Sequence, residues 1–109
     1  MMKNILSKDS AKKITIFEGV HRKTLIYDKN LMICHFILEK DAEIPVHSHK
    51  EHQIGYVING KLKFLTKTGE YIAKKGDSYI FDSDEKHGAL VLEDSEVIDV
   101  FHPAREDYK

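Results

Sequence analysis

Short apolar runs separated by polar, turn-forming segments make up most of this chain. Each run has the length of a β-strand, and most are rich in Ile, Val, Tyr, Phe or Thr, the residues that favour strands. The runs are ITIF (14–17), TLIY (24–27), LMICHFIL (31–38), IGYVI (54–58), KLKFL (61–65), SYIF (78–81), GALVL (88–92) and VIDVF (97–101). Because such runs recur about every 8–12 residues, the sequence predicts an all-β sandwich or barrel.

Asn59-Gly60, between IGYVI and KLKFL, is the strongest local signal. Both residues tolerate positive φ, so a two-residue hairpin turn is expected there. IGYVI is apolar on both faces, whereas a strand half exposed to water would alternate. We therefore expect one face to line the barrel and the other to be covered by a second sheet, an N-terminal strand or a partner subunit. A homodimer is the expected assembly.

Length and charge narrow the class of protein. With 109 residues, the chain is expected to form a single domain (1–109), with its motif region at about 41–101. The net charge of −1 gives no basic field, so neither nucleic acid nor a membrane is an expected partner. Cys34 is the single cysteine and is interpreted as a buried, inert thiol. No signal-peptide or membrane-span pattern is present, which predicts a cytoplasmic protein.

The segment HSHKEHQ (47–53) concentrates three of the seven histidines. In a strand, residues two apart point to one face, so His47 and His49 can present two imidazoles to one point. Gln53 shares their parity and can add an amide oxygen, while His52 should point away. An HxH pair alone is weak evidence for a metal site, because two surface histidines would give the same pattern.

Two longer patterns strengthen the metal hypothesis. His47-x-His49-x3-Gln53-x6-Gly60, preceded by Ile44-Pro45, resembles the first cupin motif, and Gly76-Asp77-x9-His87 resembles the second. The resemblance implies a cupin double-stranded β-helix, a jelly-roll-like barrel of two antiparallel sheets. It also implies one divalent transition metal (nickel, zinc, iron, manganese, cobalt or copper), with the ligands His47, His49, Gln53 and His87.

Three departures from the cupin motifs stand out. Asp41 replaces a usual Gly, and Asp82 and Asp84 replace a usual Pro and Gly without changing the spacing to His87. Gln53 replaces a usual glutamate. Three histidines and an amide are all neutral, so the whole charge of the metal would remain available to an anionic ligand such as a carboxylate or an enolate.

A second group of polar residues lies near the C-terminal end. Asp99 falls inside an apolar strand and shares a face with Val97 and Phe101. If that face lines the barrel, a carboxylate is held among apolar residues, which is costly unless it is paired or functional. The alternative is that Asp99 faces solvent near the end of an edge strand. Arg105, a few residues later, is either a site residue or an ordinary surface residue.

Several pieces together resemble the KdgF-type cupins: His47-Ser-His49, QIGYV from Gln53, His87-Gly-Ala and DVFHPARED from Asp99. This family converts 4,5-unsaturated uronates from pectin or alginate breakdown to linear keto acids. The resemblance implies a small anionic sugar-acid substrate and the catalytic residues Asp99, Phe101 and Arg105. His102 and Ala104 depart from the usual Ser and Pro, but neither occupies a mapped position.

Two alternatives remain open on these residues. One is a cupin dioxygenase that uses a redox metal at the same ligands. The other is a non-catalytic, metal-dependent sugar-acid binding module, although no helix-turn-helix segment accompanies the predicted barrel. Three aromatic residues in the predicted strands are interpreted as core or dimer contacts, namely Tyr56, Tyr79 and Phe81.

Overall fold

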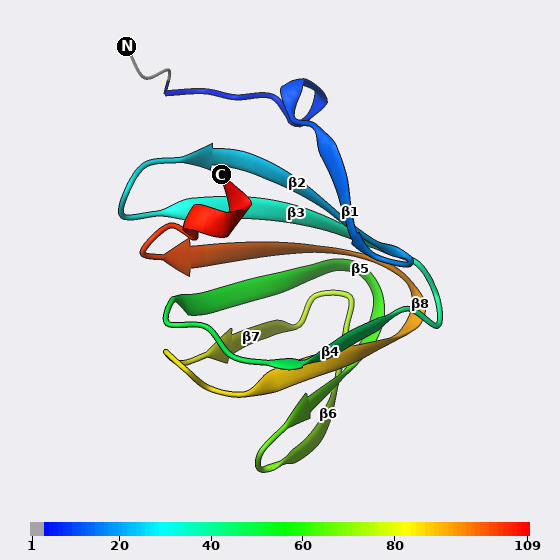
Figure 1. Cartoon of the computed structure of the whole chain (residues 1–109). Helices are drawn as coiled ribbons and strands as arrows, with labels where there is room; N and C mark the ends of the chain where they lie inside the picture. Colours follow the sequence, from blue (N-terminus) through cyan, green and yellow to red (C-terminus); the bar gives the residue numbers. More distant parts are fainter. Residues whose placement is uncertain (1–3) are drawn as a thin grey trace.

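The computed structural model describes residues 4–109, so the first three residues of the predicted domain lie outside the described part. Eight strands and two short 3₁₀ helices form within that range (Figure 1). In chain order they are η1 (Lys8–Ser10), β1 (Lys13–Phe17), β2 (Val20–Tyr27), β3 (Met32–Leu38), β4 (Glu43–His47), β5 (His52–Thr66), β6 (Gly69–Lys74), β7 (Ser78–Phe81), β8 (His87–His102) and η2 (Glu106–Tyr108).

The strands form an antiparallel barrel that folds around β5 and β8. The main strand order is β1-β2-β3-β8-β5-β6, with β4 paired to β8 and β7 paired to β5. β5 and β8 contain 15 and 16 residues, so each contributes one half to each side of the barrel. The second half of β8 pairs with β3, and its first half pairs with β4 on the opposite side (Figure 1). The all-β cupin architecture is therefore confirmed.

The prediction of a two-residue hairpin turn at Asn59-Gly60 is wrong. β5 continues through both residues, and its pairing with β8 changes register on either side of Asn59. Gly60 adopts a φ of 96°, and a Cβ there would overlap the side chain of Ser95. The backbone N–H of Lys61 instead donates to the Ser95 hydroxyl at 3.0 Å. The positive φ thus produces a bend within one long strand, because β8 pairs with both halves of it.

Side chains on the inner faces of the strands form the core. On β3, Met32, Cys34, Phe36 and Leu38 are all buried. Cys34 is completely inaccessible, and burial raises the pKa of its thiol to about 11. The interpretation of Cys34 as a buried thiol is therefore confirmed, and its thiolate form is a minor species at neutral pH.

The outer face of β5 stays open to solvent. Ile54 and Tyr56 are each 51% exposed, and Ile80 of the neighbouring β7 is 70% exposed. Within residues 4–109, neither an N-terminal strand nor a second sheet covers this face, because β1 lies at the far edge beside β2 (Figure 1). The expected cover by an N-terminal strand or by a second sheet is therefore wrong. Cover of this face by a partner subunit stays a prediction.

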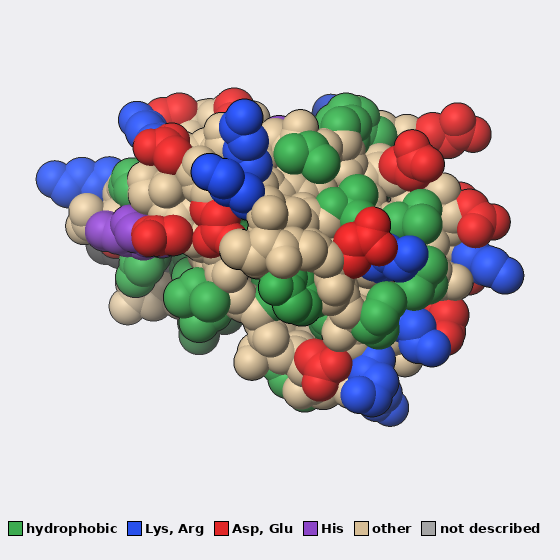
Figure 2. Space-filling view, turned by 90° about the horizontal axis from the view of Figure 1, so that it is seen from below, with side chains coloured by type: hydrophobic (Ala, Val, Ile, Leu, Met, Phe, Trp, Pro, Cys, Tyr) green, Lys and Arg blue, Asp and Glu red, His purple; other side chains and the backbone are tan. Residues whose placement is uncertain are grey.

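Charged side chains of both signs are interspersed over the surface. The view from below the barrel shows basic and acidic groups side by side, with hydrophobic side chains between them (Figure 2). This distribution matches the net charge of −1. In the described range, neither 3₁₀ helix has the length or the apolar character needed to cross a membrane.

Candidate functional site

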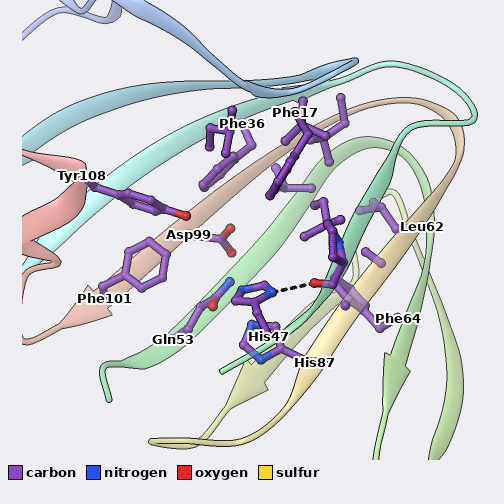
Figure 3. A pocket seen from close by; sticks show the side chains of 18 of the residues that line it. Phe17, Phe36, His47, Gln53, Leu62, Phe64, His87, Asp99, Phe101 and Tyr108 are labelled. Atoms are coloured by element: carbon purple, nitrogen blue, oxygen red, sulfur yellow. Dashed lines mark hydrogen bonds between the residues drawn. The ribbon is translucent and has the colours of Figure 1, made fainter. Parts of the chain in front are cut away.

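A cavity of about 380 Å³ occupies the interior of the barrel. One part of its wall is polar, with histidine, glutamine and aspartate side chains directed inward (Figure 3). The rest is apolar and includes Phe17, Phe36, Leu62 and Phe64. A cavity that combines a broad apolar wall with a few convergent polar groups is typical of small-molecule sites.

Three histidines gather at the polar end of this cavity. His47 ends β4, His87 begins β8, and the two are partners in the strand register. His49 lies in the loop before β5. One ring nitrogen from each histidine lies within 4.8 Å of the others, a spacing that one metal ion can bridge. By contrast, His52 is exposed and points away, as its parity predicted.

Each of these rings is oriented by a backbone carbonyl two residues away. Nδ1 of His47 lies 2.8 Å from the oxygen of Pro45, and Nδ1 of His87 lies 2.8 Å from that of Glu85. Nδ1 of His49 lies 2.9 Å from the oxygen of Glu51. A carbonyl only accepts, so each Nδ1 carries the proton and each Nε2 carries a lone pair. This is the arrangement that prepares histidine as a metal ligand.

Among the described residues, the Nε2 lone pairs of His49 and His87 have no hydrogen-bond donor. Nε2 of His87 is buried and has no hydrogen-bond partner within residues 4–109. Nε2 of His49 faces the amide oxygen of Gln53 at 3.0 Å, which places two acceptors together. Burial lowers the pKa of His49, so a second proton on that ring is disfavoured. A cation bound by both atoms would relieve the conflict, and the donor set therefore fits a metal ion.

Aromatic packing closes the histidine cluster on one side. The ring of Phe81 stacks on His87 with centroids 4.1 Å apart and planes 6° apart. Burial lowers the pKa of His87 to about 4, so this imidazole stays neutral at pH 7. A neutral imidazole is the form that binds a metal.

Asp99 lies on the inner face of β8 and is only 5% exposed. The expectation that it faces the barrel interior is confirmed, and the solvent-facing alternative is wrong. Tyr79 donates a hydrogen bond from its hydroxyl to Asp99 Oδ1 at 2.5 Å. Burial raises the pKa of Asp99 to about 6, although hydrogen bonds from Tyr79 and Gln53 and the charge of Arg105 oppose that rise. Asp99 is thus a carboxyl group poised to exchange a proton near neutral pH.

Phe101 and Arg105 complete this side of the cavity. Phe101 is 1% exposed, and its ring lies edge-on to that of His49 with centroids 5.7 Å apart. The guanidinium of Arg105 lies 3.8 Å from the ring centre of Tyr108 and pairs with Asp107 at 3.0 Å. The Arg105 side chain is only 11% exposed and lines the cavity, so its interpretation as a plain surface residue is wrong.

Two residues of the cavity wall escaped the sequence analysis. Tyr79 was assigned to the core or a dimer contact, yet its hydroxyl bonds to Asp99. Nothing in the sequence paired Tyr79 with a residue twenty positions away. Tyr108 of η2 contributes its ring to the wall, between the guanidinium groups of Arg22 and Arg105. No pattern in the tail predicted that contact.

Comparisons with known proteins agree on the family. The cupin domain model matches residues 34–101. The pectin degradation protein KdgF of Dickeya dadantii (strain 3937) is 34% identical over 93 residues, which cover 84% of each chain.

Solved structures show the same fold. An RmlC-like cupin from Shewanella frigidimarina superimposes with a TM-score of 0.92 at 28% identity, over 99% of this chain and 97% of its own. KdgF from Halomonas sp. superimposes with a TM-score of 0.91 at 27% identity, over 99% of this chain and 100% of its own. With its motifs, its barrel and these relatives in agreement, the chain belongs to the cupin family and, within it, is a homologue of the pectin degradation protein KdgF.

Proposed function

We propose that this protein is a metal-dependent enzyme that converts 4,5-unsaturated uronates to linear keto acids. The observation that carries the proposal is the meeting of two groups in one cavity. The cluster of His47, His49 and His87 with Gln53 forms one group, and Asp99 with Arg105 forms the other. Homology to a pectin degradation protein supports a sugar acid as the substrate.

The substrate carries a carboxylate beside a vinyl ether and an anomeric hydroxyl. Arg105 uses Nε and Nη2 on Asp107, which leaves Nη1 for the substrate carboxylate. His47, His49, Gln53 and His87 would hold a divalent ion, and such an ion would supply Lewis-acid stabilisation of negative charge at this end of the cavity. Because all four ligands are neutral, they would not weaken the attraction of the site for an anion.

Asp99 is the residue placed to move the proton. Its ionised carboxylate would take the proton of the anomeric hydroxyl as the bond between the anomeric carbon and the ring oxygen breaks. This step yields an aldehyde and an enolate. Asp99 would then return the proton to C4, which becomes CH2 while C5 becomes a ketone. The net change is an isomerisation, so it needs neither an oxidant nor a reductant.

The apolar wall would accommodate the body of the sugar and exclude water. Phe101 lies beside His49, and Phe36 lies opposite, across the cavity from the histidines (Figure 3). Packing against such rings positions the substrate and limits access of bulk water to the enolate. A positioned carboxylate in this environment exchanges protons with the substrate rather than with solvent.

An anaerobic assay tests the proposed reaction. Metal-loaded protein is mixed with freshly lyase-generated unsaturated uronate monomer, and loss of the double-bond absorbance is followed while NMR identifies the product. We expect acceleration over the spontaneous reaction that is abolished by a chelator and supported by a redox-inert ion. Turnover that requires oxygen would instead indicate a dioxygenase. Binding of metal and sugar acid without product would indicate a binding module.

Elemental analysis of the purified protein tests the metal site directly. We expect about one equivalent of a transition metal per chain, drawn from nickel, zinc, iron, manganese, cobalt or copper, since imidazole and amide ligands accept all of these. Protein purified with no bound metal, and unable to take up any of these ions after chelation, would contradict the assigned ligands.

A second copy of this chain is the proposed cover for the open face of β5. Ile54 and Tyr56 lie next to Val100 and Ile98 of β8 in the register, and Ile80 lies on the other side of Ile54. A contiguous apolar sheet face of this kind is self-complementary about a two-fold axis. Light scattering should therefore report a dimer, and Ile54→Lys should shift it to a monomer. A wild-type monomer would contradict the proposal.

A further inference from the structure

Tyr79 makes the closest polar contact to Asp99. Its hydroxyl lies 2.5 Å from Asp99 Oδ1, at the short end of the range for a hydroxyl donating to a carboxylate. Burial holds the pKa of Tyr79 well above its usual value, so the phenol keeps its proton and is the donor. One carboxylate oxygen of Asp99 is thus occupied by a neutral donor from another strand.

Between Tyr79 and Asp99, the strand β5 carries a glycine, which leaves space for their contact. Gly55 of β5 is the register partner of both Asp99 in β8 and Tyr79 in β7. A Cβ at Gly55 would overlap the Tyr79 ring and Asp99 Oδ1. The missing side chain therefore lets the Tyr79 ring pass beneath β5 and reach the carboxylate. This use of Gly55 depends on space, because its φ does not lie in the left-handed region.

Aromatic neighbours fix the direction from which the hydroxyl approaches. The Tyr79 ring packs against Phe64 with centroids 4.6 Å apart and against Phe81 with centroids 5.7 Å apart. Phe81 in turn stacks on His87 of the histidine cluster. The orientation of Tyr79 is therefore tied to the same wall that supports the proposed metal ligands.

We propose that Tyr79 is the positioning residue for Asp99: its hydroxyl holds Oδ1, so that Oδ2 is presented to the cavity and to the substrate. The inference rests on the proposed function, in which Asp99 moves the proton. Tyr79 lines the same cavity, but its hydroxyl is engaged by Asp99 and acts on the reacting atoms through that carboxylate. Its contribution is to keep the carboxylate from rotating and to solvate its negative charge where water is excluded.

The carboxylate has few other means of restraint. Arg105 contributes charge, but its guanidinium is paired with Asp107 rather than with Asp99. The Gln53 amide also hydrogen-bonds Asp99, but its oxygen is directed to His49. Tyr79 is therefore the donor near Asp99 that is free of a second polar task. Removing its hydroxyl should change the alignment of Asp99 and leave the histidine cluster in place.

Kinetics of Tyr79→Phe test the proposal in the metal-loaded enzyme. We expect kcat to fall about 10–100-fold, the effect of losing one hydrogen bond to a charged group, with KM hardly changed. In an Asp99→Asn background the same substitution should cause no further loss, because the hydroxyl acts through Asp99. Tyr71→Phe, which removes an exposed hydroxyl that contacts Thr68, is the matched control. Normal kcat in Tyr79→Phe, or an equal loss in both backgrounds, would overturn the inference.

A proton NMR experiment on zinc-loaded protein separates this inference from the proposed reaction. A hydroxyl proton in so short a hydrogen bond should resonate far downfield, and should vanish in both Tyr79→Phe and Asp99→Asn. Gly55→Ala, which forces the pair apart, should remove it as well if the variant folds. If the wild type fails to ketonise the uronate, the proposed function fails. The resonance still decides this inference: its presence supports a held carboxylate, and its absence overturns it.

Discussion

The two ends of the polar wall are built in different ways. At the histidine end, each ring is oriented by a carbonyl two residues away in the chain, as with His47 and Pro45. At the Asp99 end, the contacts join distant segments. Tyr79 of β7 is twenty residues from Asp99 of β8 in the chain. One end depends on local backbone geometry, and the other depends on how β5, β7 and β8 pack.

Because of this difference, we expect substitutions at one end of the wall to leave the function of the other end intact. A local contact survives small shifts between strands, because both partners move together. A contact between strands is lost when either strand moves or either side chain changes. We therefore expect changes at the histidine end to act on metal binding, and changes at the Asp99 end to act on turnover while metal remains bound.

The largest effect should follow from removing a histidine. We expect His87→Ala to lose more metal affinity than the ~10–100-fold caused by losing a supporting contact, because it deletes a ligand atom itself. Turnover should fall with it. Metal titration of the chelated protein measures the affinity, and circular dichroism checks the fold. The matched control is His52→Ala, which removes an exposed histidine at the start of β5 that points away from the cluster. Equal metal loss in both variants would break the comparison.

The next effect separates the two ends. Asp99→Asn should reduce turnover by about 10²–10⁴-fold, the usual contribution of positioned proton transfer, while the metal content stays normal. Glu96→Gln, a half-buried position of the same strand whose parity directs it away from the cavity, is the control. Near-normal turnover in Asp99→Asn would remove Asp99 from the mechanism, and loss of metal would show that the two ends are coupled.

The same variant makes a prediction about stability. Burial raises the pKa of Asp99 to about 6, above its ordinary value of 3.8. A raised pKa means that the folded state favours the protonated carboxyl group. The stabilisation of the folded state that this provides is complete below about pH 4 and is lost as the pH rises through 6. At pH 7 the ionised carboxylate therefore opposes folding, and the metal-free Asp99→Asn variant should melt no lower than the wild type. A clear drop in its melting temperature at pH 7 would mean that the contacts of Asp99 outweigh its burial.

A smaller effect tests whether the histidine end needs the aromatic ring that packs on it. Phe81→Leu removes the ring stacked on His87 but leaves the carbonyl of Glu85 in place. We expect a destabilisation of about 0.5–3 kcal/mol in urea unfolding, with metal affinity reduced less than ~10-fold. A much greater loss of metal would show that packing, rather than the backbone, orients His87.

The smallest expected effect concerns β3, the strand that pairs with β8 beside Asp99. Cys34 is the register partner of Asp99 on β3, and burial raises the pKa of its thiol to about 11. Because the thiolate form is scarce well below that pH, native protein should react slowly with a thiol reagent at pH 8 and rapidly in urea. Fast alkylation of the native protein would reveal opening between β3 and β8, and would mean that the Asp99 end is not fixed.

The sequence predicted some elements well and others poorly, for identifiable reasons. Period two grouped Asp99 with Val97 and Phe101 on one face of β8, and all three are buried. The Asn59-Gly60 turn failed because its local preference is shared by a hairpin and by a bend in a long strand. Only the pairing of β8 with both halves of β5 distinguishes the two.

By itself, strand periodicity predicted an all-β fold and directed His47 and His49 to one face, because it acts over a few residues. His87 was grouped with them only through the resemblance to the cupin motifs. Period two put Asp99 on one face with Val97 and Phe101, and the structure decided that this face lines the barrel. The tertiary structure alone decided that Tyr79 and Gly55 belong to this site, since their contact with Asp99 exists only after three strands pair. Local spacing encodes which face a residue occupies, whereas packing between strands decides which residue it meets there.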